Sequence, residues 1–259
     1  MTSTRLWRIV EVMKLALMSD LHANRQAVEA VWSRIRDEGF DQLVLLGDYV
    51  DYGADPVWTL DFVRERVTQG ALAVKGNHDD AIAHESHHSL GAHVLESLHW
   101  TQRQLDATHR DFIASLPLTA RLGDCLITHA NAHAPADWSY IHGRLEASRS
   151  LYATDDRVVF CGHMHDPKLY HLSSTGKHGE FTPVSEVGIE LSRARRWLAI
   201  PGSVGQPRDG NPAACYATFD TDTDLLTFHR VPYDHDTAAA RILSAGLPPL
   251  MAERLQHGQ

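Results

Sequence analysis

The chain has 259 residues and a formal net charge of −9, and 18 of its residues are histidine. Hydrophobic residues make up 43% and charged residues 22% of the sequence, which is ordinary for a globular protein and excludes a disordered chain, a collagen and a coiled coil. The acidic balance argues against a nucleic-acid binder that relies on a basic face. The excess of imidazole indicates metal or acid–base chemistry without showing which histidines take part.

The sequence predicts neither a membrane span nor a disulfide framework. The longest apolar runs, such as residues 43–46, are far shorter than the ~20 residues that cross a bilayer. Residues 1–12 lack the apolar core of a signal peptide, and they are either an extension or precede an alternative start at Met13. We expect a cytoplasmic protein with one domain over residues 1–259. The cysteines are few and odd in number: Cys125, Cys161 and Cys215.

The first third of the chain alternates strands and helices. Residues 13–19 are an apolar run that predicts a buried strand, and a helix is expected over 24–39. The next strand is expected at 41–48, followed by a helix that begins at Pro56. A third strand with its exit loop covers residues 71–79. This order is typical of an α/β sheet built from βαβ units.

The rest of the chain predicts helix first and strands afterwards. Residues 80–116 are helical in character, and strands are expected at 124–130 and 157–165. From about residue 166 the stretches are shorter, with turn residues between them. This pattern is typical of an antiparallel meander, which could form a second sheet packed on the first. The meander strands are expected at 196–203, 213–220 and 225–231, and residues 234–259 as a C-terminal helix or tail.

Polar side chains follow five of the expected strands at the point where each strand ends. Asp20, Asp48 and Asn77 lie 28 and 29 residues apart, which is the length of a βαβ unit. The carboxyl edge of such a sheet is where ligands bind. Residues separated by one other point to the same side of a strand, so each such pair can direct two ligands into one pocket. The full set is Asp20, His22, Asp48, Asn77, His78, His129, His163 and His165.

Apart from His78, this set offers four imidazoles, two carboxylates and one amide oxygen. Such a mixture suits Mn²⁺, Fe, Zn²⁺, Co²⁺ or Ni²⁺ better than Ca²⁺, or Mg²⁺ alone. Seven donors are too many for one zinc ion but suit two metal ions that share a carboxylate. A turn or capping role would explain Asp20, Asp48 or Asn77 taken singly, but not the histidines that accompany most of the motifs.

This ordered set resembles the calcineurin-like metallophosphoesterase superfamily over residues 14–220, and segment 201–208 is similar to its small bacterial phosphodiesterase-like branch. The resemblance implies a four-layer α/β/β/α sandwich of two mixed sheets. It also implies two divalent transition-metal ions, with manganese favoured. The first ion would be held by Asp20, His22 and His165, the second by Asn77, His129 and His163, and Asp48 would bridge them.

The reaction implied by the resemblance is hydrolysis of a small phosphoester by metal-bound hydroxide. His78 directly follows the ligand Asn77 and is the candidate general acid for the leaving oxygen. Asp51 is expected to hold and orient His78, with a surface turn as the alternative. No nucleic-acid partner is expected.

Segment 47–53 is similar to a loop of the Ser/Thr phosphatases in this superfamily, which carry an arginine where this chain has Tyr52 and a glutamate where it has Asp79. Because that arginine grips a phosphate dianion, its absence argues against a protein phosphatase. We therefore expect a phosphodiester or a small phosphorylated metabolite as substrate. Tyr52 and Arg208 are candidate substrate-binding residues, and a plain β-turn role for Arg208 stays open.

Three alternative functions remain at this point. A diadenosine-tetraphosphatase-like or other nucleotide phosphatase and a nuclease are alternatives within enzymes, although the acidic balance weighs against the nuclease. A non-catalytic metal-binding scaffold is the alternative outside enzymes. Asn131 and His133 are expected to be solvated loop residues, and a solvated helical face is expected for His84, His87 and His88.

Overall fold

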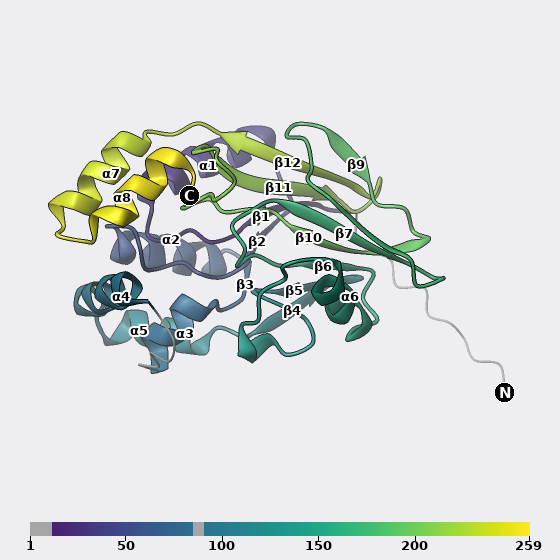
Figure 1. Ribbon diagram of the computed structural model, residues 1–259, viewed down its shortest axis with the longest axis horizontal. Helices are drawn as coiled ribbons and strands as arrows, with labels where there is room; N and C mark the ends of the chain where they lie inside the picture. Colours follow the sequence, from purple (N-terminus) through teal and green to yellow (C-terminus); the bar gives the residue numbers. More distant parts are fainter. Residues whose placement is uncertain (1–11, 85–90) are drawn as a thin grey trace.

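The computed structural model describes residues 12–84 and 91–259 and contains two six-stranded mixed sheets (Figure 1). The first sheet has the order β3 (Leu72–Ala73), β2 (Gln42–Leu45), β1 (Lys14–Met18), β11 (Ala214–Asp220), β12 (Leu225–Val231) and β9 (Gly188–Glu190). The second has the order β4 (Thr119–Leu122), β5 (Cys125–Thr128), β6 (Val158–Phe160), β10 (Arg195–Ile200), β7 (Lys168–Ser173) and β8 (His178–Phe181).

Alternation along the strands explains why the molecule has four layers. Leu15 and Leu17 of β1 pack against Phe160 of the second sheet, in the apolar core between the sheets. Ala16 and Met18 point to the opposite face, where they pack with helices α1 (Arg25–Glu38) and α2 (Pro56–Thr68). Helix α6 (Arg144–Tyr152) covers the outer face of the second sheet through a separate apolar cluster. The predicted α/β/β/α sandwich is confirmed.

The ends of α1 follow the signals in the sequence. The Asn24 side chain caps the helix by accepting a hydrogen bond from the Ala27 N–H, and the chain leaves the helix at Gly39 with a φ of 73°. Helix α2 begins at Pro56, where a missing N–H costs nothing.

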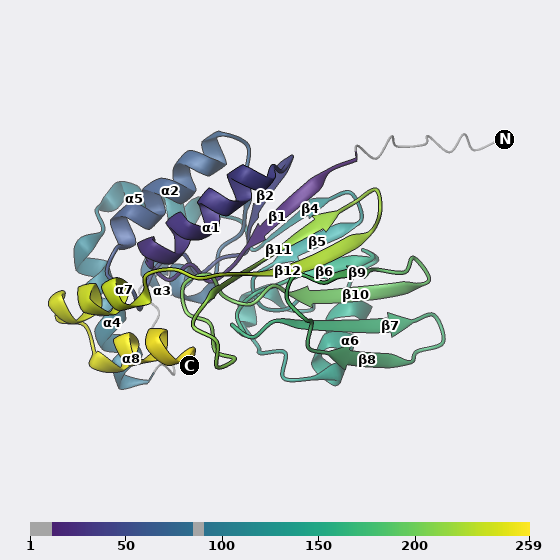
Figure 2. The ribbon, with the colours of Figure 1, turned by 90° about the horizontal axis from the view of Figure 1, so that it is seen from above.

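The other five α-helices of the described residues gather at one end of the molecule (Figure 2). They are α3 (Asn77–His84), α4 (Ala92–Gln104), α5 (Ala107–Ser115), α7 (His235–Ser244) and α8 (Pro249–His257), and a short 3₁₀ turn covers Pro135–Asp137. No helix within the described ranges is long and apolar enough to cross a membrane.

Parallel pairing brings the ends of five strands together. Strands β1, β2 and β3 run parallel in the first sheet, and β5 and β6 run parallel in the second. Their carboxyl ends therefore lie at one edge of each sheet. A hydrogen bond from the His163 N–H to the Asp20 carboxylate, 3.1 Å long, joins the edge of one sheet to that of the other.

Several element predictions need correction. The expected meander does not form one sheet, because β11 and β12 pair beside β1 whereas β10 joins β6 in the second sheet. Strand β3 has only two residues, and Asn77 begins a helix instead of lying in a loop. Residues 234–259 form two helices. Strand β4 and helix α6 were not predicted at all. Residues 1–11, His87 and His88 lie outside the described residues.

Candidate metal centre

The predicted Asp and His ligands form two overlapping groups at the shared edge of the sheets. Within each group the ligand atoms lie within 4.8 Å of one another, and every residue is buried. Asp48 belongs to both groups. One group adds Asp20, His22 and His165, and the other adds His129 and His163. The amide oxygen of Asn77 lies 3.1 Å from His129 Nε2, so the predicted amide donor also reaches the second group.

The backbone is strained where it presents these side chains. Asp20, His22, Asp48, His163 and His165 all have φ values between 45° and 68°, in the left-handed region that non-glycine residues rarely adopt. Each such residue costs of order 1–3 kcal/mol, so the surrounding structure must impose the conformation. Backbone hydrogen bonds between the exit loops of β1 and β2 help to impose it. One of them runs from the His22 N–H to the Asp48 carbonyl at 3.0 Å.

Each of the four imidazoles uses one ring nitrogen on a backbone carbonyl. Nδ1 of His22, His129 and His165 lies 3.1, 2.7 and 2.6 Å from the carbonyls of Val50, Leu46 and Gln206, respectively. For His163 the nitrogen is Nε2, 2.9 Å from the Trp138 carbonyl. A carbonyl only accepts, so these nitrogens carry hydrogen, and the other nitrogen of each ring is left for a ligand.

The contact between His22 and His165 tests whether a cation fits. Their Nε2 atoms are 3.0 Å apart, and both rings already carry hydrogen on Nδ1. In the neutral rings two lone pairs therefore face each other, with the Asp20 carboxylate 3.3 Å from His165 Nε2. Only hydrogen-bond acceptors converge at this point, and contacts within the protein do not satisfy them. These atoms therefore fit the ligand set of a bound cation.

The pKa values of the four candidate ligand histidines are shifted in different directions by their surroundings. Burial, with a neighbouring imidazole, lowers the pKa of His22 well below its usual value, and it lowers the pKa of His163 to about 3. Burial and the Arg208 guanidinium lower the pKa of His165. Burial would lower the pKa of His129 too, but the Asp48 carboxylate outweighs it and raises the pKa to about 9.

A further histidine stands beside the metal centre without belonging to either group. His78 Nδ1 lies 2.7 Å from Asp51 Oδ2, and its backbone N–H donates to Asp48 Oδ1 at 2.9 Å. Burial alone would lower the pKa of His78, but the Asp48 and Asp51 carboxylates outweigh it and raise the pKa. The hydroxyl of Ser97, in α4, donates to Asp51 at 2.5 Å, a contact that the sequence did not indicate.

Comparison with known proteins identifies the chain. Residues 13–224 match the model of the calcineurin-like phosphoesterase superfamily domain. The chain belongs to this superfamily. It is therefore a hydrolase of phosphoric ester bonds, and the family implies divalent metal ions at the Asp/His groups.

Three relatives show how far the similarity extends. The protein MJ0912 of Methanocaldococcus jannaschii is 31% identical over 250 residues, which are 95% of this chain and 98% of that protein. A metallophosphoesterase from Sphaerobacter thermophilus is 35% identical, covers 96% of this chain and all of its own, and has a TM-score of 0.83. The protein PH1004 of Pyrococcus horikoshii shares the fold with a TM-score of 0.76 at 18% identity, over 95% of this chain and 98% of its own.

Two buried residues of this phosphoesterase, Tyr52 and Asp79, stand where the Ser/Thr phosphatases carry an arginine and a glutamate. The Tyr52 hydroxyl lies 3.0 Å from His78 Nε2. Asp79 accepts hydrogen bonds from the N–H groups of Asp48, Tyr49 and Gly76, at 2.8, 2.9 and 3.0 Å. It therefore ties the exit loops of β2 and β3 together. Burial and the Asp48 carboxylate raise the pKa of Asp79 to about 7.

The loop after β5 covers the second group of ligands. The expectation of solvated residues is wrong for Asn131, which is buried and donates to Asp137 Oδ1 at 2.9 Å. The same loop supplies the Trp138 carbonyl to His163, and the ring of Tyr140 stacks on His163 with centroids 4.0 Å apart. Neither aromatic residue was predicted, because stacking on a ligand leaves no spacing signal in the sequence.

The remaining predicted residues lie at or beyond the rim of the centre. The guanidinium of half-buried Arg208 lies 5.7 Å from the ring centroid of Tyr52. His84 is exposed and pairs with Asp80 at 3.0 Å, which fits the expected solvated face. His133 is half-buried.

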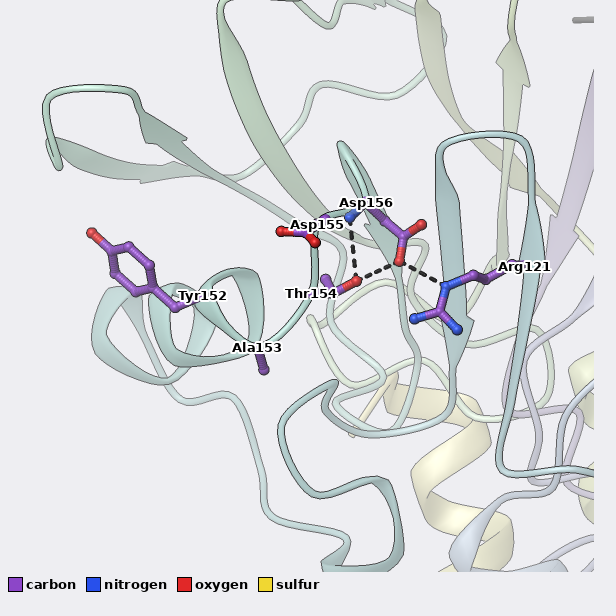
Figure 3. Close-up of a pocket in the computed structure, with 6 residues that line it drawn as sticks. All are labelled: Arg121, Tyr152, Ala153, Thr154, Asp155 and Asp156. Carbon is purple, nitrogen blue, oxygen red and sulfur yellow. Dashed lines mark hydrogen bonds and ion pairs between the residues drawn. The ribbon is translucent and has the colours of Figure 1, made fainter. Parts of the chain in front are cut away.

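A surface hollow of about 350 Å³ lies elsewhere, between β4 and the end of α6 (Figure 3). Its Arg121 is paired with Asp156 at 3.0 Å, and Thr154 donates to the same carboxylate. The hollow shares no residue with the candidate metal centre, and its one guanidinium, that of Arg121, is paired with Asp156. It does not supply the chemistry of this hydrolase.

Proposed function

We propose that the protein is a dinuclear phosphoesterase that hydrolyses a phosphodiester or a small phosphorylated metabolite. In this proposal two divalent cations, of which manganese is favoured, would share Asp48 as a ligand. The first cation would be held by Asp20, His22 and His165, and the second by Asn77, His129 and His163. The observation that carries the proposal is the orientation of the four imidazoles, each with one nitrogen fixed by a carbonyl and the other left for a ligand.

When bound, two divalent cations supply water of lowered pKa and offset negative charge on the phosphoryl oxygens. The protein's own contribution is to position them. The carbonyls of Val50, Leu46 and Gln206 fix the ring orientation of three histidines, and changes in such outer contacts typically cost 10–100-fold in metal affinity or activity.

His78 is proposed to protonate the leaving oxygen. Asp51 holds Nδ1, so Nε2 is the nitrogen that transfers the proton. The raised pKa keeps His78 protonated at a higher pH than an ordinary histidine, as a general acid requires. In the structure the Tyr52 hydroxyl occupies the hydrogen-bonding position on Nε2, which the leaving oxygen would take in the complex.

Turnover of bis(p-nitrophenyl) phosphate and p-nitrophenyl phosphate with Mn²⁺, with and without a chelator, tests the proposal. We expect chelator-sensitive hydrolysis of at least one ester and two metal ions per chain by elemental analysis. Asp48→Asn should reduce the metal content to one or none, because the shared carboxylate is lost. Asp37→Asn, at an exposed position of α1, is the matched control and should retain both ions.

Two results would overturn the proposal. Absence of chelator-sensitive turnover with several metals would leave only the metal-binding scaffold. Retention of two ions by Asp48→Asn would show that the bridge is wrongly assigned.

A further inference from the structure

Two half-buried arginines in the described part of the chain have no carboxylate partner. Arg208 lies on the loop between β10 and β11, and Arg254 lies in the last turn of α8; both are half-buried. In the part of the chain that the structure describes, neither guanidinium forms an ion pair, and Arg208 instead donates to Gln206 Oε1 at 2.7 Å. A partly desolvated guanidinium without a counter-charge is ready to bind an anion.

Helix α8 is anchored on the loop that carries Arg208. The Gly210 N–H donates to the Gly258 carbonyl at 2.9 Å, directly after the helix ends. Met251 and Leu255 of the same helix pack in one apolar cluster with Tyr52. Arg254 lies between Met251 and Leu255 in the sequence. Burial and the charge of the neighbouring Arg208 lower the pKa of Arg254, while the Tyr52 hydroxyl opposes that effect.

Arg208 borders the candidate reaction centre on the side of His78, and the helix that carries Arg254 packs in the same cluster as Tyr52. The ring of Tyr52 lies under the Arg208 guanidinium, and its hydroxyl contacts His78 Nε2 at 3.0 Å. The Arg208 backbone N–H also donates to the carbonyl of His165, at 3.3 Å. Arg254 lies outside residues 13–224, which match the family model, in the C-terminal helices that follow them.

We propose that Arg208 and Arg254 form an anion subsite that binds a second phosphoryl group of the substrate. The proposal rests on the proposed function and narrows its substrate class to small molecules with two phosphoryl groups, one hydrolysed and one held. A guanidinium presents a planar fork of hydrogen-bond donors that matches phosphoryl oxygens. Two positively charged guanidinium groups bind a phosphoryl dianion better than they bind a carboxylate, which carries a single charge. The subsite lies on the leaving-group side, because Arg208 lies over the ring of Tyr52, whose hydroxyl contacts His78, and the helix that carries Arg254 packs against the same tyrosine.

The test compares two probes that differ by one phosphonate group. Methylphosphonate and ethane-1,2-diphosphonate are titrated calorimetrically into the Mn²⁺-loaded protein and into Arg254→Met, which keeps the apolar stem of the side chain. Wild-type protein should bind the diphosphonate at least about tenfold more tightly than methylphosphonate. In Arg254→Met the ratio of the two affinities should fall toward one. Arg254→Lys should retain part of the preference.

Arg149→Met is the matched control, because Arg149 also lies in the last turn of a helix but is exposed on α6. It should leave the affinity ratio unchanged. An equal ratio in wild type and Arg254→Met, or no preference in wild type, would overturn the subsite. Hydrolysis of bis(p-nitrophenyl) phosphate by the wild-type protein tests the proposed function separately, since that ester has no second phosphoryl group. Loss of the ratio and loss of turnover are therefore distinguishable.

Discussion

The four histidines of the metal centre differ in the charge that they carry before a cation binds. The pKa values of His22 and His165 are lowered, and that of His163 is about 3, so these three rings are neutral at pH 7.5. His129 has a pKa of about 9, because its Nε2 lies 3.2 Å from the Asp48 carboxylate. If the proposed assignment holds, the second cation would displace a proton from His129.

We expect metal loading at pH 7.5 to release about one proton per chain, although four histidines become ligands. The apparent metal affinity should rise with pH up to about 9, where His129 loses its proton without metal. Calorimetry in buffers of different ionisation enthalpy measures the number released. His129→Gln should bring it close to zero, and release of three or more protons would show that the charge states are wrongly assigned.

His78 gives a prediction about leaving groups. His78→Ala should keep both metal ions but slow hydrolysis of alkyl esters by about 10²–10⁴, and that of p-nitrophenyl esters much less, because p-nitrophenolate leaves without a proton. The wild-type rate for alkyl esters should fall as pH rises through the raised pKa of His78. His84→Ala, at an exposed position of the same helix, is the control and should leave the rate unchanged. Equal losses for both leaving groups would contradict the general-acid role.

At the scale of elements, Asp79 fixes the start of α3 against the exit of β2. Both of its carboxylate oxygens accept backbone N–H groups, whereas an amide has only one acceptor oxygen. Asp79→Asn should therefore leave at least one buried donor unpaired and lower the free energy of unfolding by about 1–3 kcal/mol. Chemical denaturation at pH 6, below the Asp79 pKa of about 7, measures this change, because at higher pH the burial of the carboxylate charge destabilises the wild-type protein and offsets it.

Asp80→Asn is the neighbouring control on the same helix. Asp80 is half-buried and pairs with Lys75 and His84 near the surface, and such pairs contribute about 0–1 kcal/mol. If Asp80→Asn lowers the free energy of unfolding as much as Asp79→Asn does, the effect comes from the loss of a negative charge in α3 and not from the hydrogen bonds of Asp79.

Elements with strong local signals were predictable from the sequence. Helix α1 carries its own cap at Asn24 and its stop at Gly39, and β1 is a continuous apolar run, so local chemistry determines both. The partner of a strand is not a local property. Strands β10 and β11 have similar apolar sequences, yet one pairs with β6 and the other with β1. Strand β4 is short and half-buried, and it gives almost no periodic signal.

The candidate ligands were predictable for a reason that belongs to the whole molecule. Parallel strands bring their carboxyl ends to one edge, so residues such as Asp20 and Asp48, distant in sequence, could be placed together from strand order. What fixes those residues could not be predicted. The Ser97 hydroxyl and the Trp138 carbonyl come from helices and loops whose docking depends on tertiary packing. The same holds for the packing of α8 against Tyr52, on which the proposed role of Arg254 depends.

The candidate metal ligands come from the exit loops of both sheets, and these loops approach each other closely at Gly162. A Cβ added at Gly162, in the exit of β6, would lie 1.8 Å from Ser19 Oγ and 2.5 Å from Asp20 Oδ2, both in the other sheet's exit loop. Such a clash cannot be relieved by a flexible side chain, because Ser19 and Asp20 are buried and hydrogen-bonded to each other. Gly162→Ala must therefore push Asp20 away from the exit loop of β6, which carries His165.

We expect Gly162→Ala to lower the free energy of unfolding by about 1–3 kcal/mol through overpacking. The affinity for the first cation should fall by about 10–100-fold, because Asp20 is displaced relative to His165. Thermal unfolding and Mn²⁺ titration measure the two effects. Gly143→Ala is the matched control, since a Cβ there meets no atom closer than 3.8 Å, and it should change neither quantity. Normal Mn²⁺ affinity in a destabilised Gly162→Ala protein would show that the ligands do not depend on the spacing between the sheets.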